Sequence, residues 1–105
     1  MGKIYNDALA VINKALAHNK KWENRWPWKE REISSIIVRA NVVLDIAVDK
    51  KQHMRICASN LARIGNTVGA NYYTLRAEQY DKDANVASEV LNNIDSWHRL
   101  PKILL

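Results

Sequence analysis

The stretch WKEREISSIIVRANVVLDIAV, residues 28–48, decides the fold class of this chain. Apolar residues recur in it at intervals of three and four, for example at Ile33, Ile36 and Ala40. This spacing is that of an amphipathic α-helix. Further valines and isoleucines widen the apolar face so far that we expect this helix to be largely buried at the centre of the core. Asp45 interrupts the apolar run, and we interpret it as part of a narrow edge facing solvent; contact with another subunit is the alternative.

The same helical period continues on both sides of this stretch and predicts three further helices. The four expected helices cover residues 3–18, 28–48, 50–80 and 83–98. Short connections join them, and a chain of 105 residues has the length of one domain. We therefore expect a single domain over residues 1–105, all-α, with the architecture of an antiparallel up-down four-helix bundle.

The expected helix boundaries depend on capping residues and glycines. Asp49 with Gln52 has the form of a capping box, which predicts a bend or break there, although a continuous helix also fits the pattern. Asp81–Asp83 predicts the start of the last helix. Gly65 could end the third helix, but an apolar repeat with spacings of four and three favours one long helix through Gly65 and Gly69. This repeat comprises Leu61, Gly65, Val68, Tyr72 and Leu75.

The composition excludes several classes of protein. Hydrophobic residues make up 48% of the chain and charged residues 26%, as in ordinary soluble globular domains. The single cysteine, Cys57, excludes an internal disulfide and a cysteine-based zinc site. No apolar run approaches the roughly 20 residues that span a bilayer, and the amino terminus lacks the apolar region of a signal peptide. We therefore expect a cytoplasmic protein that does not interact with membranes.

The formal net charge of +5 is distributed unevenly along the chain. Residues 1–63 contain 12 Lys or Arg and six Asp or Glu, whereas residues 64–105 contain four and five. A basic surface attracts polyanions and releases their counterions on binding, which favours RNA or DNA as a partner. A solvated surface that only keeps the protein soluble explains the charge equally well, because a net charge of this size is ordinary.

The basic residues of the first two thirds are the candidate contacts to nucleic acid. They are Lys20, Lys21, Arg25, Lys29, Lys50, Lys51, Arg55 and Arg63. Three tryptophans also occur within seven residues, and Trp22 or Trp28 could stack on a base. The alternative is that the tryptophans close the open end of the bundle. We expect at least one of them to be structural and one to be exposed.

The sequence contains no recognisable catalytic or metal-binding constellation, so we expect no enzyme activity, no cofactor and no metal site. The histidines His18, His53 and His98 do not form the His-Glu-x-x-His or Glu-x-x-His patterns of helical metal sites. Cys57 lies on the apolar face of a predicted helix, which is typical of a small buried hydrophobe rather than a reactive thiolate. The serines of the predicted helices lack the glycine-rich context of a nucleophile elbow.

Short motifs between residues 20 and 100 resemble those of one known family. They are Trp26-Pro27-Trp28-Lys29-Glu30-Arg31, Ala47 to Lys51, Leu61 to Ile64, Leu75-Arg76 and Ile94 to Trp97. The family is that of four-helix bundles that include accessory variability determinants of diversity-generating retroelements and proteins encoded by intervening sequences of 23S rRNA genes. Its members often carry a glycine pair just before the last tryptophan, where this chain has Asp95 and Ser96.

The resemblance implies a basic, self-associating bundle, often a ring-like pentamer, that binds nucleic acid and a reverse transcriptase and has no active site of its own. Independently, the apolar circumference of residues 28–48 exceeds what a lone small bundle covers easily, so we expect a homo-oligomer. The predicted function is that of a basic, non-catalytic accessory protein. The alternative is a small protein-only interaction module, such as a phage or plasmid inhibitor or regulator of a host factor.

Overall fold

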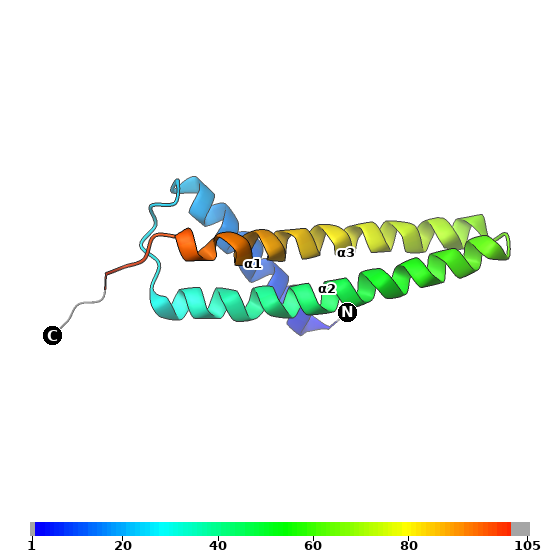
Figure 1. Cartoon of the computed structure of the whole chain (residues 1–105), viewed down its shortest axis with the longest axis horizontal. Helices are drawn as coiled ribbons and strands as arrows, with labels where there is room; N and C mark the ends of the chain where they lie inside the picture. Colours follow the sequence, from blue (N-terminus) through cyan, green and yellow to red (C-terminus); the bar gives the residue numbers. More distant parts are fainter. Residues whose placement is uncertain (1, 102–105) are drawn as a thin grey trace.

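The computed structural model describes residues 2–101, which form three α-helices and one short 3-10 helix. The elements are α1 (Lys3–Lys21), α2 (Glu30–Arg63), α3 (Thr67–Asn93) and η1 (Ile94–Ser96). α2 and α3 run antiparallel as a long hairpin, and α1 crosses one half of this hairpin obliquely (Figure 1). The molecule is accordingly elongated, with extents of 67 × 22 × 20 Å.

The predicted all-α fold is confirmed for the described residues, but they form three α-helices and not the expected four. The first difference is at Asp49, where α2 continues without the expected break. Apolar side chains recur at every seventh position across this point, at Ala47, Met54 and Leu61, so the contact with α3 continues. Asp49 is exposed in the middle of α2 and does not start a new helix.

The second difference is the turn between α2 and α3, which interrupts the long helix expected over residues 50–80. Gly65 has a φ of +82°, in the left-handed region that glycine adopts without steric cost. The Asn66 side chain accepts a hydrogen bond of 2.9 Å from the backbone N–H of Gly69 and thereby caps α3. The chain therefore reverses direction at Gly65, and the glycine ends the helix that precedes it.

The third difference is at Asp81 and Asp83, where a fourth helix was expected to start. Both carboxylates instead have side-chain partners. The hydroxyl of Tyr5 donates a hydrogen bond of 2.6 Å to buried Asp83, and Gln79 donates a second of 3.1 Å. The ammonium group of Lys51 donates to Asp81 at 2.9 Å. These aspartates connect helices rather than cap one, and α3 runs through both positions.

Small residues at heptad spacing hold α2 and α3 together. Buried alanines lie seven residues apart on each helix: Ala40 and Ala47 on α2, and Ala70, Ala77 and Ala84 on α3. A methyl side chain lets two helices approach closely, and the seven-residue spacing keeps the contact on one face. The largest fully buried side chains come from all three helices and complete a single core: Ile12, Ile33, Val43 and Val90.

The apolar face of residues 28–48 is covered largely within the chain. Among its large hydrophobic residues only Val38 and Val48 are exposed. The circumference of this helix therefore gives less support to self-association than the sequence indicated. Asp45 is exposed, which agrees with its interpretation as part of a solvent-facing edge.

Beyond α1 the hairpin continues as a two-helix arm, which we define as residues 50–78 (Figure 1). The remaining described residues, 2–49 and 79–101, form the base. Three members of the apolar repeat that favoured one long helix, Val68, Tyr72 and Leu75, do not belong to a buried face, because they are 83%, 55% and 65% exposed. The turn at Gly65 directs the alanine face of α3 toward α2 and leaves these three side chains in solvent.

Replacing Ala47 with leucine should destabilise the protein by about 1–3 kcal/mol, because the seam has no room for three further carbon atoms. Urea denaturation followed by circular dichroism measures this change. Ala62→Leu is the matched control on the exposed side of α2 and should change the free energy of unfolding by less than about 0.5 kcal/mol. Equal effects of the two substitutions would contradict the close packing of the seam.

Tyr5→Phe should destabilise the protein by about 1–3 kcal/mol, because it removes a donor from the buried carboxylate of Asp83. Burial, followed by the hydrogen bond and charge of Asp83, raises the pKa of Tyr5 well above its ordinary value of 10.0. The contribution of this phenol is therefore complete below pH 10 and is lost as the pH rises toward its folded-state pKa. The difference in unfolding free energy between wild type and Tyr5→Phe should accordingly shrink above pH 10.

Tyr73→Phe is the control for this experiment, since Tyr73 is half-buried on the arm and lies outside the Tyr5–Asp83 pair. It should show neither the destabilisation at neutral pH nor the change above pH 10. A Tyr5→Phe protein as stable as wild type would mean that the buried pair does not hold α1 to α3.

Candidate nucleic-acid interface

The structure divides the eight predicted basic contacts into two separate groups. Four belong to the base (Lys20, Lys21, Arg25 and Lys29) and four to the arm (Lys50, Lys51, Arg55 and Arg63). At 1.5 Å per helical residue, roughly 30 Å of α2 separates Lys29 from Lys50, and roughly 50 Å separates it from Arg63. One continuous patch of all eight residues is therefore not formed.

Carboxylates accompany the basic residues of the base. Residues 2–49 and 79–101 contain ten Lys or Arg and ten Asp or Glu, so the described base has no formal net charge. Three of its cations lie beside carboxylates: Lys20 and Glu89 at 3.7 Å, Arg25 and Glu23 at 4.0 Å, and Arg99 and Glu30 at 3.1 Å. The potential of this surface is weakened accordingly.

The arm, by contrast, has an excess of basic residues. Residues 50–78 contain five cations, Lys50, Lys51, Arg55, Arg63 and Arg76, and one acidic residue, Glu78. The arm therefore carries a formal net charge of +4. Four of the five net charges of the whole chain lie on this two-helix projection, which makes it the electropositive end of the molecule.

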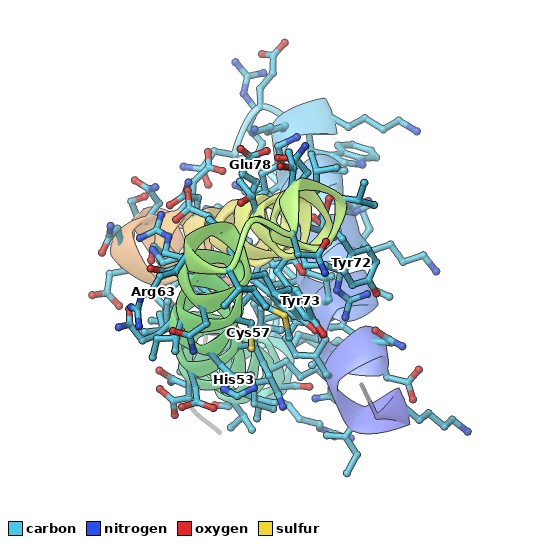
Figure 2. All side chains as sticks on the ribbon, turned by 90° about the vertical axis from the view of Figure 1, so that its right-hand side faces the viewer. His53, Cys57, Arg63, Tyr72, Tyr73 and Glu78 are labelled. Carbon is cyan, nitrogen blue, oxygen red and sulfur yellow. The ribbon has the colours of Figure 1, made fainter. Side chains whose placement is uncertain are left out.

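The cations of the arm differ in whether they form an ion pair. Lys51 is held by Asp81, and this hydrogen bond and charge, with a smaller effect of Arg55, lower the pKa of the Asp81 carboxyl. In residues 2–101, the other four arm cations form no ion pair. Arg63 and Tyr72 lie on opposite flanks when the arm is viewed from its tip (Figure 2).

Arg76 and two tyrosines are interface candidates that the sequence interpretation missed. The Arg76 guanidinium lies 6.0 Å from the ring centre of Tyr72 and 5.7 Å from that of Tyr80. Tyr72 and Tyr73 contact each other edge to face, with ring centres 5.1 Å apart. Arg76, Tyr72 and Tyr73 belong to residues 64–105, in which acidic residues slightly outnumber basic ones. Only the turn at Gly65 places them beside the basic end of α2.

The tryptophans of the base have distinct positions. Trp28 is 6% exposed, stacks on Trp97 with ring centres 5.3 Å apart, and donates its indole N–H to Asn19 at 3.0 Å. Its backbone also pairs with the chain beyond η1 through hydrogen bonds of 3.1 and 2.8 Å. Trp22, by contrast, is 47% exposed. The expectation of one structural and one exposed tryptophan is confirmed, and Trp22 is the better candidate for stacking.

Groups with reactive or metal-binding chemistry are sparse in the described residues. His53 Nε2 and Cys57 Sγ lie 3.8 Å apart on the part of α2 that belongs to the arm, where His53 is exposed and Cys57 half-buried, and both are labelled in Figure 2. Within residues 2–101, no three His, Cys, Asp or Glu side chains converge as a metal site would require. Likewise, none of the helices described is long and apolar enough to cross a bilayer.

Comparison of the chain with protein-family models, with curated proteins and with solved structures gave no match.

Trp22→Phe should reduce quenching of the intrinsic fluorescence by acrylamide, because the most exposed indole is then absent. The remaining emission comes from Trp26, Trp28 and Trp97, of which the latter two are buried. Stern–Volmer plots of wild type and variant measure the accessible fraction, with circular dichroism to confirm that the helices persist. Unchanged quenching would contradict the exposed position of Trp22.

Proposed function

We propose that this chain is a basic, non-catalytic nucleic-acid-binding protein whose arm contacts phosphates. The observation that carries the proposal is the separation of charge: five cations against one acid on the arm, and ten against ten on the described base. A concentrated positive potential speeds encounter with a polyanion and releases counterions from it. Electrostatic attraction should therefore direct a polyanion to the arm rather than to the base.

The dimensions of the arm suit this role. Each of its two helices is about 20 Å long at 1.5 Å per residue. A duplex of that length carries roughly a dozen phosphate charges, at one per 1.7 Å. Lys50, Arg55, Arg63 and Arg76 could thus reach several phosphates together. Since phosphate contacts carry no sequence information, binding should tolerate many sequences. Tyr72 adds an exposed ring for stacking on unpaired bases.

The protein partners follow from the resemblance and from the apolar surface of the arm. We include in the proposal an accessory role beside a reverse transcriptase, with the chain acting as a homo-oligomer in the cytoplasm. Val68, Tyr72 and Leu75 supply an exposed apolar stripe available to a protein partner. A neighbouring gene for a reverse transcriptase would support this part of the proposal.

A protein-only interaction module is the second candidate function. The same stripe of Val68, Tyr72 and Leu75 favours it, because exposed apolar side chains at helical spacing are typical of a helix-binding face. The two functions differ in one property. Nucleic-acid binding falls steeply with salt, whereas contact through an apolar stripe changes little.

Charge reversal on the arm should nearly abolish binding to RNA and DNA, while the same change on the base should leave most of it. The arm variant is Lys50→Glu, Arg55→Glu and Arg63→Glu, which avoids Lys51 because of its pair with Asp81. The matched base variant is Lys20→Glu, Lys21→Glu and Arg25→Glu. Fluorescence anisotropy of labelled oligonucleotides with purified protein, at about 50 mM salt, measures the affinity.

Salt titration of single alanine variants measures how many phosphates the protein neutralises. Removing one cation that binds a phosphate should reduce the slope of log affinity against log salt by roughly 0.7–0.9. If the charge-reversal variants of the arm and of the base weaken binding equally, the assignment of the interface to the arm is wrong. If the unmodified protein does not bind under these conditions, the protein-only module becomes the better assignment.

A further inference from the structure

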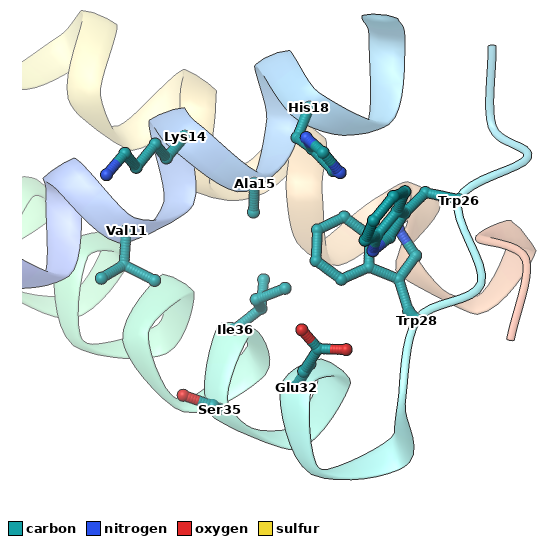
Figure 3. Close-up of a pocket in the computed structure, with 9 residues that line it drawn as sticks. All are labelled: Val11, Lys14, Ala15, His18, Trp26, Trp28, Glu32, Ser35 and Ile36. Atoms are coloured by element: carbon teal, nitrogen blue, oxygen red, sulfur yellow. The ribbon is translucent and has the colours of Figure 1, made fainter. Parts of the chain in front are cut away.

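An open pocket lies between α1 and α2 in the base, far from the arm. Its volume is about 450 Å³, within the range of small-molecule sites. Val11, Ala15 and Ile36 form an apolar stretch along it, and His18, Trp26 and Trp28 form an aromatic end (Figure 3). Nothing in the proposed contact between the arm and nucleic acid uses this pocket.

Contacts within the chain hold the rings of the aromatic end in place without a ligand. The His18 ring lies edge to face with Trp26 and with Trp28, at centre distances of 4.4 and 5.7 Å. Trp28 is fixed from behind by its stacking on Trp97 and by its hydrogen bond to Asn19. Rings held in this way lose little conformational freedom on binding, so the site is preorganised.

The charges at the pocket are arranged asymmetrically. The Glu32 carboxylate extends from the first turn of α2 toward the ring of Trp28, whereas the Lys14 side chain extends along α1 away from the rings (Figure 3). One Glu32 oxygen accepts the backbone N–H of Lys29 at 2.9 Å. Within residues 2–101, Glu32 takes part in no ion pair. The aromatic end is therefore bordered by a carboxylate without a cation.

We propose that this pocket binds a small methylated ammonium compound of the choline type. Aromatic faces attract a cation through their quadrupole, and a trimethylammonium group offers an apolar surface with a diffuse charge. Glu32 supplies the opposite charge, and the apolar stretch of Val11, Ala15 and Ile36 accommodates the short carbon chain. A phosphate group fits less well at the aromatic end, because the Glu32 carboxylate beside the rings repels it.

The test uses wild-type protein and three probes: choline, its neutral carbon analogue dimethylbutanol, and adenosine monophosphate. In dimethylbutanol a tert-butyl group replaces the trimethylammonium, so the shape is kept and the charge is removed. Choline should shift the indole N–H signals of Trp26 and Trp28 in a proton–nitrogen NMR spectrum. The neutral analogue should bind at least about tenfold more weakly, since the cation–π and carboxylate contributions are absent.

Two variants separate the roles of the charged residues. Glu32→Gln removes the charge but keeps an acceptor for the Lys29 N–H, because glutamine also serves at this position of a capping box. It should weaken choline binding about tenfold, whereas Lys14→Ala removes a like charge from the pocket lining and should not weaken it.

Three results would overturn the proposal. They are no shift of Trp26 or Trp28 at choline concentrations up to about 50 mM, equal binding of choline and dimethylbutanol, or preferential binding of adenosine monophosphate that disappears in Lys14→Ala. Because none of these measurements involves the arm, they stand whether or not the chain binds nucleic acid.

Discussion

The alanine seam between α2 and α3 is the contact on which the rest of the structure depends. Methyl side chains allow close approach of the two helices but bury little apolar area per turn, so the hairpin gains from a third layer. α1 supplies this layer through Ile12 and the Tyr5–Asp83 hydrogen bond. With 19 residues α1 is about 29 Å long, against about 51 Å for the 34 residues of α2. A covered base and an uncovered arm follow from this difference in length.

The helical period of the sequence predicted the all-α class and the position of the core, because burial of one helix face is a local pattern. The helix boundaries were harder to predict. An aspartate serves equally well as a cap and as a partner for a distant side chain, and the sequence does not show that Asp83 meets Tyr5 across 78 residues. Gly65 carried a usable signal, but the apolar repeat that crosses it outweighed that signal and predicted a helix that is too long.

The candidate interface was predictable in its residue types but not in its grouping. Lys50, Arg55 and Arg63 were found from sequence because they are basic. Arg76 was not found, because residues 64–105 contain more acidic than basic residues and because its neighbours in space are known only once the chain reverses at Gly65. The sequence does not show which cations form ion pairs or which segments pack together. The absence of a net charge on the base therefore became evident only from the fold. The pocket beside Glu32 depends on the crossing of α1 over α2, which no local pattern specifies.

The absence of a third helix along the described arm has a consequence for its dynamics. Amide hydrogens near the turn at Gly65 are protected by two helices alone, so exchange with solvent should quicken progressively from Ala47 toward Asn66. Opening of the tip need not disturb Asp83 or the residues around it. We therefore expect the arm to bend more readily than the base, which three helices hold together.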